Sequence, residues 1–301
     1  MRRVSVVQVG IVVTDRYRPD DEDNDTGPLI RALEERGVSA EPVVWHRWPA
    51  DAEDAARFSL LVLRSPWDYP QREQEFRRWL QQAQEHVTVL NPPALVTWNL
   101  DKLYLRELEE RGIALVPTEW VTDASELDAA LARRGSDWAV IKPSVSAGAE
   151  DTELLRADSP AAKSLGERIL GLGRTVMIQP EIPELSEGME KALYFIDGAH
   201  THTIAKGALL ARGGGFRGGQ YLENPQPVTA SEEETAFGAE VMRAVETATG
   251  GEAPLYGRVD MVSSAEHGIV LLEVELFEPA LNLHRVPDAA RSLAEAIADR
   301  L

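Results

Sequence analysis

The sequence predicts an α/β (α+β) protein in three parts: an N-terminal domain with a parallel sheet, a small central α+β unit and a C-terminal α+β unit with an antiparallel sheet. First, apolar runs rich in β-branched residues alternate with helical segments up to about Pro93, as in βαβ units. Second, Asn91-Pro92-Pro93 interrupts this alternation, because consecutive prolines lack backbone donors and fix their φ angles. Third, strands in the last third follow one another across short polar turns, which favours antiparallel hairpins.

The N-terminal domain is expected over residues 1–93. Its first strand, predicted over Val4–Val13, is too short to span a bilayer, and no small-residue cleavage site follows it. The helix predicted over 71–85 is amphipathic, with apolar residues at spacings of three and four. The other expected elements are a helix over 27–36 and strands over 42–45, 60–63 and 87–90.

The two later units are expected over residues 94–175 and 176–301. The elements predicted in the first of them are helices over 101–111 and 160–170 and a strand over 138–141, with a further strand over 175–178 at the junction. The strands predicted in the last unit cover 192–196, 201–210, 256–262 and 269–276. Its helices are expected over 231–247, where Ser231 and Glu234 form a capping box, and near 287–301.

Composition limits the classes of partner. The 301 residues carry 31 Lys and Arg against 50 Asp and Glu, a formal charge of -19, so a phosphate backbone or an anionic membrane would repel the chain. The absence of cysteine excludes disulfides, thiolate zinc ligands and thiol nucleophiles. We therefore expect a cytoplasmic protein that binds neither nucleic acid nor membrane, and a homodimer on general grounds alone.

Three carboxylates interrupt the last two apolar strands, Asp260 in the first strand and Glu273 and Glu275 in the second. Residues two apart on a strand share a face, and the turn near Ala265 brings Asp260 opposite Leu272 or close to Glu273. Buried carboxylates without partners are costly, so the cluster predicts bound cations, and an all-oxygen set favours Mg2+ or Mn2+ over zinc. The alternative is a solvated strand face.

A lysine at the end of a strand indicates a phosphate site. Lys142 ends an apolar strand, precedes a proline and introduces the small-residue loop 144–148, whose backbone N–H groups suit phosphate oxygens. Lys102, at a helix start, is a second candidate cation. Each has an ordinary alternative, an exposed strand cap for Lys142 and an exposed helix-start residue for Lys102.

The glycine-rich segment 213–219 contains Arg217 and formally matches G-x-G-x-x-G. That dinucleotide motif opens a helix within a βαβ unit, whereas the residues after this segment suit a mobile loop. Arg217 is a candidate cation for a transferring phosphoryl group, with a flexible surface loop as the alternative. His200 and His202 share a strand face without a third ligand nearby, so we expect them to be structural or exposed.

Taken in order, these features resemble the ATP-grasp superfamily, of the glutathione-synthetase-like type. The segments that carry the resemblance are Asn99–Lys102, Ile141–Pro143, Gln179–Glu184, Phe216-Arg217, Arg258–Asp260 and Glu273–Pro279. Leu63–Tyr69 and the ending Glu-x-Glu-x-x-Glu-Pro are further similar to the actinobacterial group of the superfamily that forms D-cycloserine. The resemblance implies an ATP-grasp fold in which residues 1–93 form a Rossmann-like pre-ATP-grasp domain.

The resemblance also implies a site in which ATP is clamped between two α+β halves. Asp260, Glu273 and Glu275 would bind one or two Mg2+ ions; Glu275 stands where many members have asparagine, which leaves the number of ions open. The implied ATP contacts are Lys102, Lys142, Ser146, Gly148, Gln179, Glu181 and Ile182, with Glu187 or Glu190 on the ribose. Lys142 and Arg217 would act in catalysis, Arg217 by steadying an acyl phosphate.

The substrate is expected between the N-terminal domain and the nucleotide, because ligands of α/β sheets gather at the carboxyl ends of strands. The residues expected to contact it are Asp15, Asp25, Arg64, Trp67, Tyr69, Arg217 and Glu278. Arg64 follows a buried strand, which favours a substrate carboxylate as its partner over a surface salt bridge. The acids from Asp20 to Asp25 would meet a substrate amino group or form a solvated loop.

The predicted activity is that of an ATP-dependent carbon–nitrogen ligase. A carboxylate is a poor acyl donor, and phosphorylation by ATP creates the leaving group that a nitrogen displaces, while the protein positions the groups and stabilises charge. The resemblance implies a small amino-acid-like substrate and antibiotic biosynthesis, by ring closure of O-ureido-D-serine to D-cycloserine. Two alternatives stay open: an intermolecular amino-acid or dipeptide ligase in natural-product biosynthesis, and a non-catalytic ATP-binding regulator.

Overall fold

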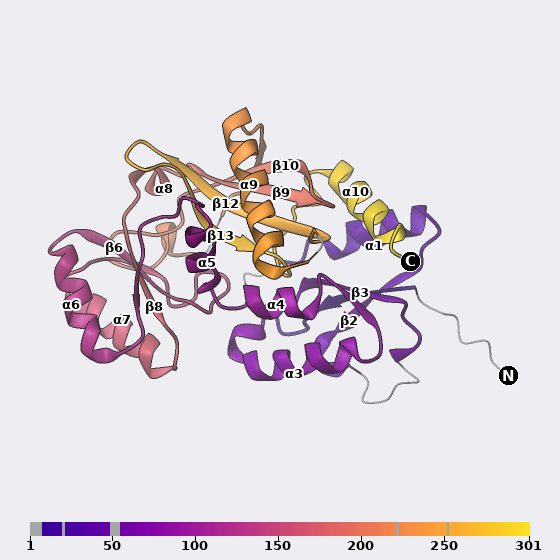
Figure 1. Ribbon diagram of the computed structural model, residues 1–301, viewed down its shortest axis with the longest axis horizontal. Coiled ribbons are helices and arrows are strands. Elements are labelled where there is room, and N and C mark those ends of the chain that lie inside the picture. Colours follow the sequence, from indigo (N-terminus) through magenta and orange to yellow (C-terminus); the bar gives the residue numbers. More distant parts are fainter. Residues whose placement is uncertain (1–7, 20–21, 49–54, 221–222, 252) are drawn as a thin grey trace.

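Three sheets and their covering helices make up the described chain (Figure 1). The computed structural model describes residues 8–19, 22–48, 55–220, 223–251 and 253–301. The central sheet lies at one end of the long axis, and the N-terminal and C-terminal sheets share the rest of the molecule (Figure 1). The predicted combination of a parallel sheet with later antiparallel sheets is confirmed.

The N-terminal sheet is parallel, with strand order β2-β1-β3-β4. Its strands are β1 (Val9–Val13), β2 (Ala40–Val44), β3 (Leu60–Ser65) and β4 (Thr88–Leu90). Its helices and turns are α1 (Thr26–Glu35), η1 (Trp45–Arg47), η2 (Tyr69–Gln71), α3 (Glu73–Gln84) and α4 (Pro93–Asn99). β1 and β3 are buried along their whole length, as parallel strands covered on both faces are. The predicted βαβ alternation is confirmed, although residues 4–7 of the first predicted strand lie outside the described residues.

Helix α3 buries the face that its spacing predicts. Phe76 on that face packs against Tyr69 and Phe277, with ring centroids 5.7 and 6.0 Å away. Phe277 follows the last strand of the C-terminal sheet, so this aromatic cluster joins the first domain to the segment that carries Glu278.

The central sheet is antiparallel, with order β5-β8-β6-β7. Its elements are β5 (Glu119–Val121), α6 (Ala124–Arg134), β6 (Trp138–Pro143), β7 (Glu153–Arg156), α7 (Pro160–Gly171) and β8 (Val176–Pro180). Sequence patterns do not predict β5 and β7, since both are short and lack a long apolar run. Because β8 pairs with β5 and β6, the expected boundary after residue 175 separates a strand from its own sheet, and we propose that the central unit ends after Pro180.

The C-terminal sheet has order β11-β10-β9-β12-β13, and all its pairs are antiparallel. Its strands are β9 (Glu190–Ile196), β10 (Ala199–Lys206), β11 (Gln226–Val228), β12 (Tyr256–Ser264) and β13 (Gly268–Glu275). Its helices and turns are α8 (Pro183–Ser186), η3 (Arg217–Gly219) and α9 (Glu232–Thr249). Helix α5 (Tyr104–Glu110) belongs to an earlier segment of the chain. The four predicted strands are confirmed, with β10 ending at Lys206, and so is the capping box of Ser231 and Glu234.

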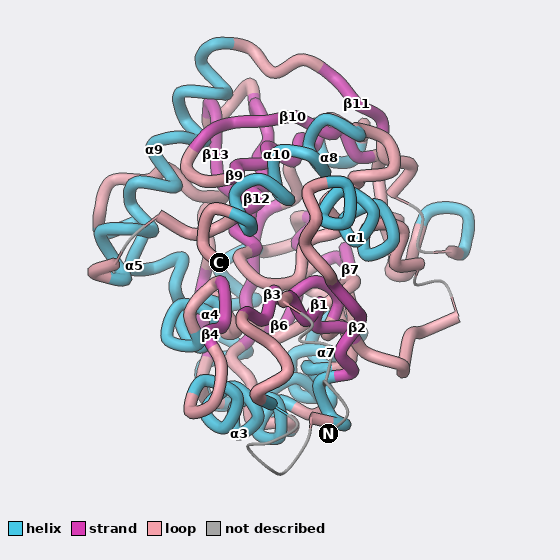
Figure 2. The backbone as a smooth tube through the Cα atoms, turned by 90° about the vertical axis from the view of Figure 1, so that its right-hand side faces the viewer, coloured by secondary structure: helices cyan, strands magenta, loops and turns pink. Residues whose placement is uncertain are grey.

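The chain then returns to its first domain. Helix α10 (Pro287–Ala298) lies beside α1 (Figure 1, Figure 2), and the two share one buried core with strands β1 and β9. The N-terminal and C-terminal sheets therefore share a continuous hydrophobic core. No helix in the described part of the chain combines the length and hydrophobicity needed to cross a bilayer.

Candidate active site

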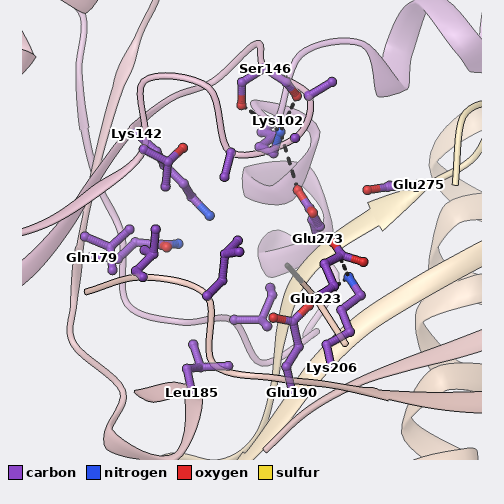
Figure 3. A pocket seen from close by; sticks show the side chains of 18 of the residues that line it. Lys102, Lys142, Ser146, Gln179, Leu185, Glu190, Lys206, Glu223, Glu273 and Glu275 are labelled. Carbon is purple, nitrogen blue, oxygen red and sulfur yellow. Dashed lines mark hydrogen bonds and ion pairs between the residues drawn. The ribbon is translucent and has the colours of Figure 1, made fainter. Parts of the chain in front are cut away.

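A cavity of about 210 Å³ opens where the three sheets meet (Figure 3). Its walls come from β6 and β8 of the central sheet, from the C-terminal sheet, from the segment 99–104 and from Tyr69 of the N-terminal domain. Apolar side chains in the lining include Val140, Leu154, Ile182, Leu185, Leu210 and Leu272. The cavity thus combines apolar walls with a dense set of charged groups.

Twelve of the residues predicted for the site line this cavity. They are Tyr69, Lys102, Lys142, Ser146, Gly148, Gln179, Glu181, Ile182, Glu190, Glu273, Glu275 and Glu278. Lys142 and Gln179 lie on the central sheet, across the cavity from the acids of the C-terminal sheet (Figure 3).

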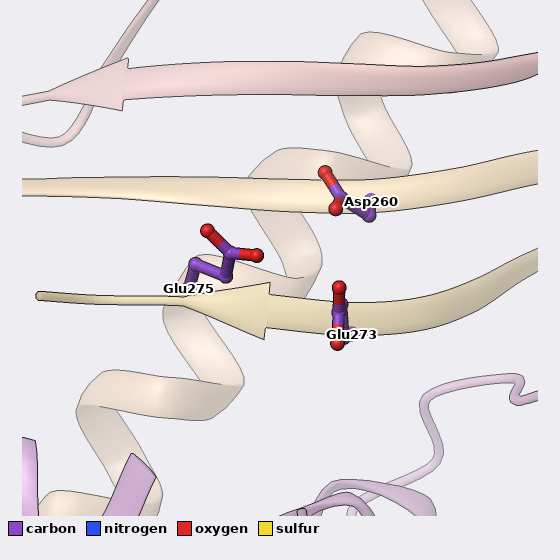
Figure 4. Close-up of side chains that lie close together, drawn as sticks. All are labelled: Asp260, Glu273 and Glu275. Carbon is purple, nitrogen blue, oxygen red and sulfur yellow. The ribbon is translucent and has the colours of Figure 1, made fainter. Parts of the chain in front are cut away.

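Asp260, Glu273 and Glu275 lie together on the adjacent strands β12 and β13 (Figure 4). The antiparallel register pairs Asp260 with Glu273. Of the two predicted arrangements, this is the one that placed Asp260 close to Glu273. One oxygen from each of the three carboxylates lies within 4.8 Å of the others. Asp260 is only 1% exposed, so this strand face is not a solvated one.

Arg258 neutralises two of these acids, a role that sequence patterns do not reveal. Its guanidinium donates to both oxygens of Asp260, at 2.8 and 2.6 Å, and to Glu275 at 2.5 Å. Arg258 precedes Asp260 by two residues on β12, so both side chains point to the same face. The position of Arg258 on a strand was predictable from sequence. Its contact with Glu275 depends on the register between β12 and β13.

Lys206 is the second cation missed from the sequence. It ends β10, and its Nζ lies 2.9 Å from Asp260, 2.9 Å from Glu190 and 3.9 Å from Glu223. Burial and the nearby Arg258 oppose its charge, but Asp260 and Glu190 raise its pKa well above the usual range. The strand predicted over 201–210 placed Lys206 in its interior, whereas β10 ends there; a lysine that follows an apolar run and precedes a glycine is the sequence feature by which it could have been found.

Lys102 joins the loop after β6 to the acid cluster. Its Nζ lies 3.4 Å from a Glu273 carboxylate oxygen and donates to the carbonyl of Ser146 at 3.2 Å. Lys142 points into the cavity, where burial lowers its pKa and Glu273 opposes that shift (Figure 3). Burial alone would raise the pKa of Glu273, but Lys102 and Lys142 outweigh it and lower that pKa to about 2.

Three other carboxylates of the cavity, those of Glu190, Glu275 and Glu278, have raised pKa values, whereas the hydrogen bonds from Arg212 lower the pKa of Glu181. Burial raises the pKa of Glu275 well above its usual range and that of Glu278 to about 7, and Glu273 adds to both shifts. Burial also raises the pKa of Glu190. Burial is the largest cause of each of these shifts, and neighbouring carboxylates add to it. A hard divalent cation fits the cluster, because its three close donors are all carboxylate oxygens.

Beside the charged groups, the end of β8 offers an extended segment next to apolar side chains. Gln179 donates to the Thr118 hydroxyl at 2.9 Å, and Glu181 accepts hydrogen bonds from Arg212 at 2.9 and 2.8 Å. Ile182 is buried at the cavity wall. Neighbouring residues thus hold the side chains of Gln179 and Glu181, and the segment itself lines the cavity.

Of the residues predicted to contact ATP or the acyl phosphate, Arg217 and Glu187 are not among those that line the cavity. Arg217 is exposed on η3 and donates to the carbonyl of Ser186 at 2.7 Å, and Glu187 is exposed beyond α8. The dihedral angles of a glycine-rich loop are not determined by its sequence, so the direction of Arg217 was not predictable. Arg258 is the arginine that lines the cavity.

Asp25 and Arg64 form a buried structural pair, whereas the sequence predicted a substrate contact. Arg64 is 0% exposed, donates to the Pro279 carbonyl at 2.8 Å and lies 3.3 Å from Asp25. Asp25 also accepts the backbone N–H groups of Leu281 and Leu283, both at 2.6 Å. The pair fastens the segment after Glu278 to the first domain.

Glu278 is held at the cavity by two side chains of the first domain. The Tyr69 hydroxyl donates to its carboxylate at 2.7 Å, and the Trp67 indole donates to its backbone carbonyl at 2.8 Å. Tyr69 and Glu278 line the cavity, and Trp67 braces the backbone behind them.

Asp15 lies elsewhere among the described residues. Its carboxylate accepts from Arg47 and lies 2.7 Å from the imidazole of His46. It does not line the cavity, and Asp20 and Asp21 of the predicted acidic stretch lie outside the described residues.

Comparison with known proteins decides the family. Residues 9–91 match the family model of the D-cycloserine synthetase DcsG N-terminal domain. Over 287 residues the chain is 33% identical to the cycloserine biosynthesis protein DcsG of Streptomyces lavendulae, covering 93% of this chain and 94% of that protein. The chain belongs to the D-cycloserine synthetase family. As a member of this family it is an ATP-grasp carbon–nitrogen ligase.

Solved structures agree with membership of the D-cycloserine synthetase family. The crystal structure of D-cycloserine synthetase DcsG has a TM-score of 0.88 at 31% identity, covering 97% of this chain and 99% of that chain. The ATP-grasp ligase PsnB, solved with minimal precursor, Mg and ADP, has a TM-score of 0.62 at 18% identity, covering 97% and 96%. The second likeness shows the ATP-grasp fold alone.

Proposed function

We propose that this ligase phosphorylates the carboxylate of O-ureido-D-serine with ATP and closes the ring of D-cycloserine. The observation that carries the proposal is one cavity in which Lys102, Lys142 and Arg258 surround the acids of β12 and β13. The family of the chain supplies the substrate class.

The nucleotide is proposed to lie along the cavity. Its phosphates would meet Lys102, Lys142 and Lys206, with the backbone of the Ser146–Gly148 loop beside them. Its adenine would lie against the segment Gln179–Ile182, where apolar walls and an extended backbone suit a flat ring with polar edges. Glu181 would flank the adenine, and Glu190 is the remaining candidate for the ribose.

Asp260, Glu273 and Glu275 are the residues that would hold Mg2+, as one or two ions, with Mn2+ able to replace it. Bound magnesium supplies charge neutralisation for the phosphates during transfer. The chain's own part is orientation: Arg258 holds Asp260 and Glu275 through a guanidinium fork, and Lys102 holds Glu273.

The chemistry needs two displacements. A carboxylate oxygen of the substrate attacks the γ-phosphorus, ADP leaves and an acyl phosphate forms. The ureido nitrogen that is bonded to oxygen then attacks the acyl carbon, phosphate departs and the nitrogen loses its proton. The carbamoyl group is then removed by hydrolysis: one water cleaves its bond to the ring nitrogen, that nitrogen takes a proton, and the group leaves as carbamic acid, which gives ammonia and carbon dioxide. Arg258 would stabilise charge on the acyl phosphate, and Glu278 lies in the same cavity as a group able to take the proton.

Hydrolysis of the acyl phosphate has to be prevented, and we propose that the loop after β6 does this. Lys102 holds it through the Ser146 carbonyl, and Arg18 of the first domain donates to the carbonyl of Gly148 at 3.3 Å. Gln71, also of the first domain, donates to Glu150 at 2.6 Å. These contacts support a closed loop over the phosphates, which would exclude water.

The test is ADP release from Mg-ATP with O-ureido-D-serine, with the product analysed by mass spectrometry. We expect turnover with this compound alone and a product lighter by the elements of water and isocyanic acid. Asp260→Asn should abolish ADP release under the same conditions. Unchanged ADP release by Asp260→Asn would refute the site.

Two other results would change the proposed function. Turnover only with pairs of amino acids, giving their sum less water, would make the chain an intermolecular ligase. Binding of Mg-ATP without ADP formation across D- and L-amino acids would indicate a regulator. Either result would refute ring closure while leaving the family unchanged.

A further inference from the structure

Strand β13, which carries Glu273 and Glu275, is an edge strand of the C-terminal sheet. Arg258 and Asp260 of β12 pair with these two glutamates, so the backbone groups of the intervening Val274 point to the open side. Buried backbone N–H and C=O groups without partners are costly. Around Leu271 the backbone of residues 114–116 pairs with this edge, through a parallel bridge between Leu115 and Leu271. The part of the edge beside the two glutamates needs other partners.

Two buried side chains occupy the place of the missing strand. The Tyr104 hydroxyl donates to the Val274 carbonyl at 2.8 Å and accepts the Val274 N–H at 2.7 Å. The Asn99 amide donates to the same carbonyl at 2.9 Å, and its oxygen accepts the N–H of Leu276 at 2.9 Å. Together they make on this edge the hydrogen bonds that a neighbouring strand would make.

On the side of β13 that pairs with β12, the backbone pairing beside the two glutamates is irregular. The pairing with β12 shifts register between Asp260 and Met261, directly beside the acid cluster. A β-bulge disrupts the ladder locally, so contacts on the outer edge carry more of the positioning there.

We infer that Asn99 and Tyr104 are positioning residues for the divalent cation, because they fix the backbone between its two glutamate ligands. The inference rests on the proposed metal role of Glu273 and Glu275. Carboxylate ligands follow their backbone, and partners behind metal ligands commonly change metal affinity about 10- to 100-fold when removed. Both residues line the cavity, and their side-chain polar atoms are hydrogen-bonded to the backbone of Val274 and Leu276.

The same segment carries Lys102 between the two positioning residues. Its Nζ lies 3.4 Å from Glu273, so the lysine and the strand that bears the acids share one support. Asn99 and Tyr104 therefore set the distance between a phosphate-binding cation and the metal-binding acids.

Electron paramagnetic resonance of Mn2+ in the presence of ADP tests this directly. Tyr104→Phe removes the hydroxyl and keeps the buried ring, and Asn99→Ala removes the amide. We expect each variant to bind Mn2+ about 10- to 100-fold more weakly. The activity of each variant should recover at high Mg2+. The concentration of Mg2+ needed for half-maximal activity should rise, and kcat at saturating Mg2+ should change less.

Tyr194→Phe is the matched control. Its hydroxyl is also bonded to backbone, donating to the Ala280 carbonyl at 2.9 Å, and it lies on β9, which β12 separates from β13. It should lose comparable stability and keep the Mn2+ affinity of the wild type.

Three outcomes would overturn the inference. Wild-type Mn2+ affinity in folded Tyr104→Phe would do so, and this variant decides the matter if Asn99→Ala fails to fold. An equal loss in Tyr194→Phe would show a general effect of destabilisation. Absence of Mn2+ binding by the wild type with ADP would refute the proposed metal role itself, and the inference with it.

Discussion

Burial lowers the pKa of Lys142, so its buried charge disfavours folding, and the favourable charge of Glu273 offsets only part of this effect. The neighbouring Lys102 and Glu273 form a close pair, and Asp260 is held by Arg258 and Lys206. At the scale of single residues, we propose that the charges of this cavity are placed for ligand binding more than for stability.

Lys142→Met separates these two effects. We expect a loss of about 10²- to 10³-fold in kcat, as for removal of one charge-stabilising donor. The free energy of unfolding should stay unchanged or rise, because a neutral side chain of similar length removes a buried charge. Chemical unfolding and ADP-release assays measure both. Lys163→Met, at an exposed pair with Asp128, is the control, and a large stability loss in Lys142→Met would contradict this account.

At the scale of elements, strands deliver their functional groups at their ends and on one face. β6 ends beside Lys142, β8 ends beside Gln179 and β10 ends at Lys206. β10 also carries His202, whose ring stacks on Tyr194 at 4.2 Å and lies 2.9 Å from the Leu281 carbonyl. The predicted structural role of His202 therefore agrees with its packing, and no metal site is needed to explain it.

His202 makes stability depend on pH. Burial lowers its pKa to about 4, against an unfolded value near 6.5. Between these values the unfolded chain binds more protons, so this contribution is complete above pH 6.5 and lost as pH falls towards 4. Over that window we expect the wild type to lose about 3 kcal/mol more than His202→Gln. Urea unfolding at several pH values measures the difference; parallel curves would contradict it, and exposed His86→Gln should follow the wild type.

At the scale of the whole molecule, the first and last parts of the chain are fastened to each other around the cavity. Asp25 and Arg64 hold the segment 279–283 to the first domain, and the Tyr256 hydroxyl donates to the Leu63 carbonyl of β3 at 2.5 Å. Helix α10 completes the connection by packing against α1. Glu278 thus reaches the cavity through contacts between parts distant in sequence.

The buried Asp25–Arg64 pair predicts strong coupling. Asp25→Asn or Arg64→Met alone should cost about 3 kcal/mol or more, because each leaves its partner buried and unpaired. The double variant should lose less than the sum by at least about 1 kcal/mol. Unfolding in denaturant measures the cycle. A folded Arg64→Met with wild-type stability and a raised KM would instead restore the substrate contact predicted from sequence.

Local patterns in the sequence were enough for the alternating N-terminal elements, the apolar face of α3, the capping box and the four strands of the C-terminal unit. They also located the acids, because a carboxylate inside an apolar strand is conspicuous wherever the strand pairs. The order of motifs indicated the family. All of these depend on residues close in the chain, where periodicity and side-chain chemistry act directly.

Only the tertiary structure decided which side chains meet. The register of β12 against β13 brought Arg258 to Glu275, and the end of β10 brought Lys206 to Asp260. It also turned Arg64 into the core and left Arg217 on an exposed loop. Strand pairing, loop dihedral angles and burial arise from contacts between distant segments, and no local pattern records them.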